Sequence, residues 1–410
     1  MDLDIPYIRV GTYYYKNIEK PLISGDKVKI MVRWNRETIV TDHGKAYLNQ
    51  TLKLDGFCCI PNHFNYEKIV KGFYNTYHEL QNKPVEKDYS LEELERLIPN
   101  SLKFIKHIFG SQSEYGLDYI KLLYEKPTQK LPILCLVSKE RSTGKSSFIK
   151  WMKSVFELNM TYIKGDSFGS QFNADWASML IVAIDEVFFD KKEITERLKY
   201  LSTTDKDKVE AKGKDRQEID FFAKFILCSN NEDNFIQVDD EEIRYWVRKI
   251  KPIESEDVFF NTKLNKEIPC FLKYLIKREY VSKHSTRMWF KKEEIMTPAL
   301  LKLLNRNNAS SKIMEQIHEC FEKIDDEELK LAPKDIHTLL KKHNNRTTVS
   351  LNDIRKVLKN WSFEPESNSK SYIGIELLSH GEYVKIDRRG RFYTIGRFSF
   401  YKIFDALLQD

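Results

Sequence analysis

The sequence has 410 residues, of which 41% are hydrophobic and 13% aromatic. At roughly 150 residues per domain this length predicts two or three domains, and the apolar content excludes a wholly disordered chain. The longest apolar run, residues 131–137, is too short to cross a bilayer. The acidic first four residues are also unlike a signal peptide. We therefore expect a soluble cytoplasmic protein with no membrane partner.

Four regions follow one another along the chain. Residues 1–100 are expected to form an N-terminal α+β domain of unknown role. Residues 101–252 alternate apolar strand-like runs with helical stretches, which predicts an α/β domain. A charged helical connector is expected at 253–330, and a separate terminal domain at 331–410.

The N-terminal region contains two kinds of pattern. Strand-like runs occupy residues 27–34 and 37–41. From residue 64 to residue 128 the apolar side chains recur at helical spacing, for example at Leu102, Ile105 and Ile108. These patterns predict strands first and then a largely helical stretch.

A phosphate-binding loop is predicted directly after the first apolar strand of the α/β region, residues 133–137. Residues 138–147, SKERSTGKSS, join that strand to a helical pattern. Backbone N–H groups of such a loop surround phosphates, its lysine reaches the β- and γ-phosphates, and its hydroxyl binds Mg²⁺. A chance G-K-S at a helix start is the alternative. The expected nucleotide contacts are Ser142, Thr143, Gly144, Lys145, Ser146 and Ser147, with Ser146 also a Mg²⁺ ligand.

Two further apolar strands end in polar side chains. Residues 179–186, MLIVAIDE, end in Asp185, which would hold Mg²⁺ through water, and Glu186, which would polarise the attacking water. Residues 225–231 end in amides, and Asn230 can position that water without adding negative charge. Each motif alone also suits a strand that leaves the core. Their order after the phosphate-binding loop favours ATP hydrolysis.

Basic side chains surround the last of these strands. A β-hairpin is predicted at 209–222, with Lys212 and Lys214 at its tip. Such a tip can bind a phosphodiester backbone, although a solvated turn is the alternative. Downstream, Arg244 and Arg248 are candidates for an arginine finger that reaches a neighbouring subunit's nucleotide, or for surface ion pairs.

Taken in order, these motifs resemble those of superfamily 3 helicases, the AAA+ replication motors of small viruses, phages and plasmids. Residues 212–230, KGKDRQEIDFFAKFILCSN, are similar to the hairpin and sensor stretch of parvoviral replication proteins. Residues 115–132 and the STGKS of the loop are similar to the phage and plasmid primase-helicase branch. The resemblance covers about residues 100–252. Lys139 and Ser142 replace two family glycines, and no primase acidic cluster is evident before residue 100.

The resemblance implies an AAA+-type P-loop ATPase core with a helical N-terminal region, working as a ring that is expected to be a hexamer. It implies ATP and Mg²⁺ as ligands, with single-stranded or forked DNA and other replication proteins as partners. The matching residues are Lys145 and Ser146 for phosphate and metal, Asp185 and Glu186 for metal and water, Asn230 for the sensor, Lys212 and Lys214 for the DNA-tracking hairpin, and Arg244, with Arg248 second, for the finger.

The C-terminal 80 residues are predicted to form a winged-helix-like domain, and they carry 14 basic against 9 acidic residues. A helix is expected after Pro333 and another after a cap at Ser350, followed by a strand and a hairpin with residues 387–391, DRRGR, at its turn. This order is typical of DNA-binding winged helices, while a small packing domain with a charged exterior is the alternative. The expected DNA contacts are Arg355, Lys356, Lys359, Arg388, Arg389 and Arg391.

These observations predict an ATP-dependent DNA helicase that moves along single-stranded DNA in the replication of a phage, plasmid or mobile element. An RNA-acting motor is a second hypothesis, which the terminal domain disfavours. A third is an ATP-switched DNA-binding initiator or regulator that never unwinds DNA, and an unwinding assay separates it from the first. Polarity, sequence specificity, ring size and the role of residues 1–100 do not follow from the sequence.

Overall fold

The computed structural model describes residues 6–21, 23, 27–187, 189, 192–210, 216–232, 235–236, 238, 244–253, 255, 257–307, 309–343, 347 and 349–408. The chain divides into two compact units, one of Met1–Ile236 with Ile243–Ala299 and one of Gln237–Glu242 with Leu300–Asp410. Within the described ranges, no helix has both the length and the apolar character needed to cross a membrane.

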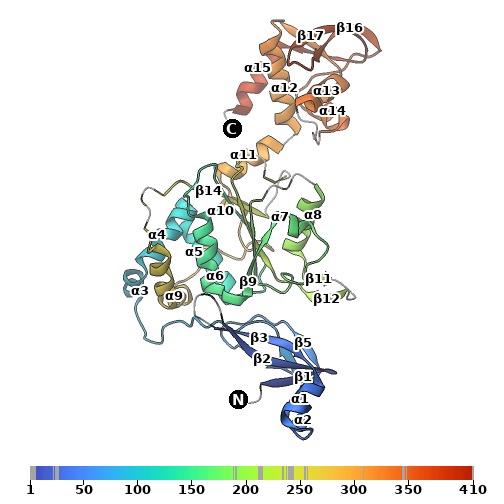
Figure 1. Cartoon of the computed structure of the whole chain (residues 1–410). Helices are drawn as coiled ribbons and strands as arrows, with labels where there is room; N and C mark the ends of the chain where they lie inside the picture. Colours follow the sequence, from blue (N-terminus) through green and yellow to red (C-terminus); the bar gives the residue numbers. More distant parts are fainter. Residues whose placement is uncertain are drawn as a thin grey trace. The chain divides into compact units, whose positions relative to one another are not determined.

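The first unit is built around a five-stranded, entirely parallel sheet (Figure 1). The spatial order is β14-β8-β13-β10-β9, so β13 separates β8 from β10. Parallel sheets need cover on both faces, and their strands are therefore continuous apolar runs. The strands are β8 (Ile133–Val137), β9 (Met160–Lys164), β10 (Ile181–Asp185), β13 (Lys224–Ser229) and β14 (Tyr245–Lys249).

Helices cover this sheet on both faces (Figure 1). One face packs into a large core with α4 (Pro99–Phe109), α5 (Ser113–Glu125), α6 (Lys145–Phe156) and α9 (Phe260–Lys277). On the other face, Phe225 of β13 contacts the rings of Phe168 and Trp176, beside α7 (Gly165–Gly169) and α8 (Lys192–Thr203). The predicted α/β class is confirmed. Shorter elements of this unit are α3 (Leu91–Leu97), η1 (Gly110–Gln112), η2 (Glu157–Asn159) and α10 (Lys292–Ile295).

The described residues before position 91 form two small sheets and two short helices. A four-stranded sheet has the order β3-β2-β1-β4, and a three-stranded sheet has the order β5-β7-β6. The elements are β1 (Tyr7–Val10), β2 (Tyr13–Pro21), β3 (Lys27–Trp34), α1 (Arg36–His43), α2 (Tyr47–Gln50), β4 (Leu52–Leu54), β5 (Gly56–Cys58), β6 (Ile69–Val70) and β7 (Phe73–Asn75). The strand predicted at 27–34 is confirmed as β3.

Two other N-terminal predictions are wrong. Residues 37–41 belong to helix α1, because the Asn35 carboxamide oxygen caps it by accepting the amide N–H two residues later at 2.8 Å. The helix predicted from residue 64 begins only at α3. Lys71 and Gly72 take left-handed φ angles of 46° and 85° and turn the chain between β6 and β7 instead.

The predicted hairpin is confirmed as the antiparallel pair β11 (Lys206–Val209) and β12 (Gln217–Asp220). Residues 211–215, which include Lys212 and Lys214, lie outside the described part. Two lysines bind backbone carbonyls at the base of the hairpin. Lys130 Nζ donates to Thr204 O and to Phe221 O, and the buried Lys224 Nζ donates to Pro127 O and Phe222 O.

The second unit has its own apolar core. The helices predicted after Pro333 and Ser350 are confirmed, and Ser350 caps the second by accepting the Asp353 N–H at 3.2 Å. The unit takes up most of α11 (Pro298–Asn307), followed by α12 (Ala309–Lys323), β15 (Glu328–Leu331), α13 (Pro333–His343), α14 (Leu351–Asn360), β16 (Lys370–Leu377), β17 (Tyr383–Gly390), β18 (Tyr393–Gly396) and α15 (Arg397–Leu408).

The predicted position of the C-terminal hairpin turn is wrong. Strands β16 and β17 pair from Leu377↔Tyr383 to Lys370↔Gly390, so their turn lies at 378–382. Gly381 supplies the left-handed residue there, with a φ of 90°. The arginine run at 387–391 consequently begins in the far end of β17 and continues toward β18, which pairs with β15.

Candidate nucleotide-binding site

Three polar strand ends predicted from the sequence meet at one edge of the parallel sheet. Strand β13 lies between β8 and β10, and all three run in the same direction. Their carboxyl ends are joined directly, because Ser138 N donates to Ser229 O at 3.2 Å and Ser229 Oγ donates to Val187 O at 2.7 Å. The loop after β8, the carboxylates after β10 and the amides after β13 therefore form one continuous surface, the place where open α/β sheets bind ligands.

Lys145 is the first residue of α6 and is held inside the loop that precedes it. Its ammonium donates to Ser138 O at 3.1 Å, and only 8% of the residue is exposed. Burial lowers the pKa of Lys145, while the nearby Asp185 and Glu232 carboxylates act in the opposite direction. The Lys145 ammonium thus binds a carbonyl of its own loop. A ligand oxygen with more negative charge can take the place of that carbonyl.

The loop backbone shows where the chain takes a left-handed φ angle and where it does not. Gly144 has a φ of 86° as the N-cap of α6, and Ser142 has a φ of 51°, a conformation that costs about 1–2 kcal/mol without glycine. Lys139 has no positive φ. Its amide instead donates to Glu232 Oε1 at 2.9 Å. Lys139 therefore causes no backbone strain, whereas Ser142 leaves local strain in the loop.

Two contacts from outside hold the same loop. Ile253 N donates to Ser142 O at 2.9 Å, and His107 Nε2, from α4, donates to Thr143 O at 2.9 Å. A Cβ on Gly144 would meet Ile253 Cδ1 and a ring carbon of Phe104, each at 3.3 Å. The loop is consequently fixed by packing from α4 and from the segment after β14, which its own sequence does not reveal.

The carboxylates and amide next to the loop lie at the surface. Asp185, Glu186 and Asn230 are exposed at the same edge of the sheet as the loop. Glu186 has a left-handed φ of 54°, and its amide donates to Asp185 Oδ1 at 2.9 Å. The chain therefore turns sharply between these two residues, directly at the end of β10.

The sequence did not indicate one carboxylate at this edge. Glu232 is only 8% exposed and forms an ion pair with Lys249 of β14 at 2.9 Å, besides its bond to the loop amide. Burial raises the pKa of Glu232, but the bonds from Lys249 and Lys139 outweigh it, so the net shift is downward. The only available signal was that Glu232 follows Asn230 by two residues at a strand end.

The two candidate finger arginines lie at different places. Arg244 precedes β14 at the amino edge of the sheet, where its carbonyl accepts the Ile133 N–H at 2.6 Å. Arg248 lies within β14 and donates to Ile108 O at 3.2 Å and to Gln112 Oε1 at 2.7 Å. The guanidinium of Arg248 is thus bound inside its own chain, by α4 and the η1 turn that follows it.

The predicted DNA contacts of the terminal domain differ in their exposure. Arg355, Lys356 and Lys359 are exposed on α14, opposite its buried face. Arg389 and Arg391 are also exposed. By contrast, the half-buried Arg388 forms ion pairs with Asp335 and with Glu376. The hairpin lysines Lys212 and Lys214 lie outside the described residues.

Comparison with known proteins agrees with this fold. A family of unknown function, DUF5906, matches residues 136–248, which include the loop and the strands beside it. Two structures of the NrS-1 C-terminal region match over nearly the whole of both chains. One has 15% identity and a TM-score of 0.53, with 96% of this chain and 95% of that chain covered. The other has 14% identity and a TM-score of 0.54, with 94% of each chain covered.

A structure of the active helicase Cch of SCCmec type IV matches with 12% identity and a TM-score of 0.43. That match covers 94% of this chain and 98% of the other. None of the curated protein sequences compared with this chain matches it. At these identities, the likeness to the NrS-1 region is one of fold.

Proposed function

We propose that this chain is an ATP-dependent DNA helicase that works as a ring in the replication of a phage, plasmid or mobile element. The observation that carries the proposal is the meeting of three motifs at the carboxyl edge of the sheet: the phosphate-binding loop, the Asp185-Glu186 pair and Asn230. The sequence resemblance to superfamily 3 helicases, and the fold shared with the NrS-1 region, support it further.

In this proposal each residue at the edge has a defined task. The Lys145 ammonium exchanges Ser138 O for phosphate oxygens, since it already lies inside the loop. Ser146 and Asp185 would hold Mg²⁺, which neutralises charge on the phosphate oxygens when bound. Glu186 orients and deprotonates the attacking water, and Asn230, at the end of the strand between loop and carboxylates, holds it in line.

The ring is needed because the proposed finger lies at the wrong edge for its own nucleotide. Arg244 precedes the five residues of β14, which at about 3.3 Å per residue separate it by roughly 17 Å from the carboxyl edge. It can therefore act only on a neighbouring subunit's ATP, and the resemblance implies a hexamer. The winged-helix-like order of α12 to β17 and the exposed cations of α14 would add a second DNA contact.

Steady-state ATP hydrolysis with and without single-stranded DNA tests the proposal. Wild type should be stimulated by DNA, and Lys145→Ala should lower kcat by about 100-fold or more, because a charge-stabilising group at the phosphates is removed. Lys150→Ala, exposed on the same helix, is the matched control and should behave as wild type. Hydrolysis that is absent from wild type, or equal in Lys145→Ala, would refute the proposal. DNA-stimulated hydrolysis without strand displacement would instead favour the ATP-switched initiator.

A further inference from the structure

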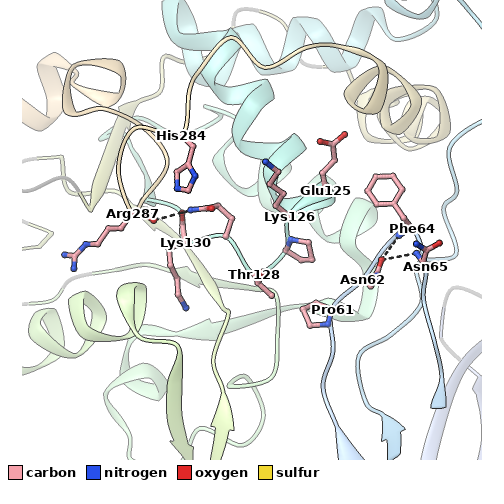
Figure 2. A pocket seen from close by; sticks show the side chains of 12 residues that line it. Pro61, Asn62, Phe64, Asn65, Glu125, Lys126, Thr128, Lys130, His284 and Arg287 are labelled. Atoms are coloured by element: carbon pink, nitrogen blue, oxygen red, sulfur yellow. Dashed lines mark hydrogen bonds between the residues drawn. The ribbon is translucent and has the colours of Figure 1, made fainter. Parts of the chain in front are cut away.

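A hollow of the first unit lies away from the nucleotide-binding edge. It has a volume of about 710 Å³ and is lined by three segments, residues 61–65, 125–130 and 284–287 (Figure 2). The middle segment leads into the amino end of β8, whereas the phosphate-binding loop leaves its carboxyl end. The hollow is thus about one strand length, roughly 17 Å, from the loop, so its chemistry is separate from ATP binding.

Two aromatic rings stand on either side of this hollow. His284 is exposed and stacks on Trp289, with ring centroids 4.8 Å apart and planes at 8°. Phe64 is 52% exposed and makes a T-shaped contact with the Tyr124 ring, with ring centroids 5.5 Å apart. Figure 2 shows His284 and Phe64 on opposite sides of Lys126. Rings that are fixed from one side and bare on the other are the platforms on which unpaired bases stack.

The charges of the hollow favour an anion. Among the described residues that line it, the one acidic side chain is Glu125, whose carboxylate already accepts Tyr280 OH at 2.7 Å and pairs with Lys121 at 3.2 Å. Lys126 and Arg287 are exposed, and the Lys126 ammonium is 4.5 Å from the centroid of the Trp289 ring. Figure 2 shows Lys126 between the two rings and Arg287 on the far side of His284, and this alternation of cations and rings matches the alternation of phosphates and bases in a single strand.

The hollow also adjoins the base of the hairpin. Lys130, which lines it, donates to Thr204 O and Phe221 O, the residues that flank the hairpin strands. A strand that passes along the hairpin can therefore continue into the hollow.

From these contacts we infer that this hollow binds a segment of single-stranded nucleic acid, with bases on Phe64 and His284 and phosphates on Lys126 and Arg287. The inference rests on the proposed function, since it extends the path of the same DNA strand.

Two matched variants of the full chain test this by fluorescence anisotropy with a labelled oligo-dT. Phe64→Ala/His284→Ala should weaken binding by about 25-fold, at about five-fold per lost stack. Lys126→Gln/Arg287→Gln should make the slope of log K against log salt shallower by about 1.4, because each phosphate contact contributes about 0.7. The controls are Lys103→Gln/Lys150→Gln, exposed on α4 and α6, and Phe398→Ala, 84% exposed in the second unit.

Photo-cross-linking of an oligo-dT that carries 5-iodouracil locates the contact independently of affinity. Cross-linked peptides that contain Phe64 or His284 support the inference. The inference is overturned if both variants bind the oligonucleotide within two-fold of wild type. It is also overturned if free dTMP competes with the oligonucleotide on wild type but no longer does so on Phe64→Ala/His284→Ala. If wild type shows DNA-stimulated ATP hydrolysis but the variants bind normally, only this inference fails. If wild type neither hydrolyses ATP nor binds the oligonucleotide, the proposed function fails with it.

Discussion

His63 is expected to make the first unit unstable in mild acid. The ring is only 8% exposed and lies between two partners, with Nδ1 2.7 Å from Tyr124 O and Nε2 2.7 Å from Tyr77 OH. Because a carbonyl oxygen only accepts, Nδ1 carries the proton and Tyr77 OH donates to Nε2. A second proton on the ring would break the bond from Tyr77 and place an uncompensated charge in the core.

The size and direction of the effect follow from the pKa of His63. Burial lowers it to about 4, from about 6.5 in the unfolded chain. The stabilisation is therefore complete above pH 6.5 and is lost as the pH falls toward 4, because only the unfolded state takes up the proton. Each pH unit costs about 1.4 kcal/mol, so about 2 kcal/mol is lost by pH 5 and about 3 kcal/mol by pH 4.

Urea denaturation followed by tryptophan fluorescence at pH 7.5, 6.5, 5.5 and 5.0 measures this loss. The comparison variant is His63→Gln, since a glutamine donates and accepts hydrogen bonds but does not titrate. Burial also lowers the pKa of His78, but this residue is present in both proteins, so its contribution cancels in the difference. Wild type should lose stability relative to the variant by about 2 kcal/mol between pH 7.5 and 5. Parallel pH profiles for the two proteins would refute the assignment of a neutral, doubly bonded His63.

Two further substitutions separate structural from binding roles. Arg388→Gln should destabilise the second unit by about 3–5 kcal/mol, because it leaves the 2%-exposed Asp335 without its ion pair. Arg389 is exposed one residue later, so Arg389→Gln should leave the melting temperature unchanged and weaken DNA binding. Equal melting curves for the two variants would contradict this. Gly144→Ala should cost about 1–2 kcal/mol and lower ATP affinity, while Ser142→Gly should be neutral or stabilising, because both positions have left-handed φ angles. Equal ATP titrations and melting temperatures for Gly144→Ala and wild type would exclude strain at that position.

The parts of the fold that the sequence predicts are those governed by local patterns. Strand β8 and helix α6 on either side of the loop, the hairpin strands β11 and β12, and the cap at Ser350 all follow from periodicity and turn chemistry. The order of these motifs also predicts that they meet, because the carboxyl ends of parallel strands share one edge.

The predictions that failed depended on competing local signals or on distant contacts. Helix α1 has a strand-like β-branched run, but its cap at Asn35 prevails. The arginine run at 387–391 has the composition of a turn, yet Gly381 fixes the turn earlier and sets the register of the whole hairpin. The bond from His107 to the loop and the ion pair of Glu232 with Lys249 join segments that are far apart in sequence, and no local pattern encodes them.

The carbonyl contacts at the base of the β11–β12 hairpin determine how it can move. Lys130 and Lys224 bind the chain on both sides of the hairpin to the segment that enters β8, so the hairpin has no independent pivot at its root. The hairpin therefore moves together with the body of the sheet. Its four-residue strands are about 13 Å long, so a rotation of the body by about 10° displaces their outer end, at Val209 and Gln217, by roughly 2 Å. A displacement of the outer end of the hairpin therefore requires a rotation of the entire α/β core. The size of that displacement depends on the length of the two strands.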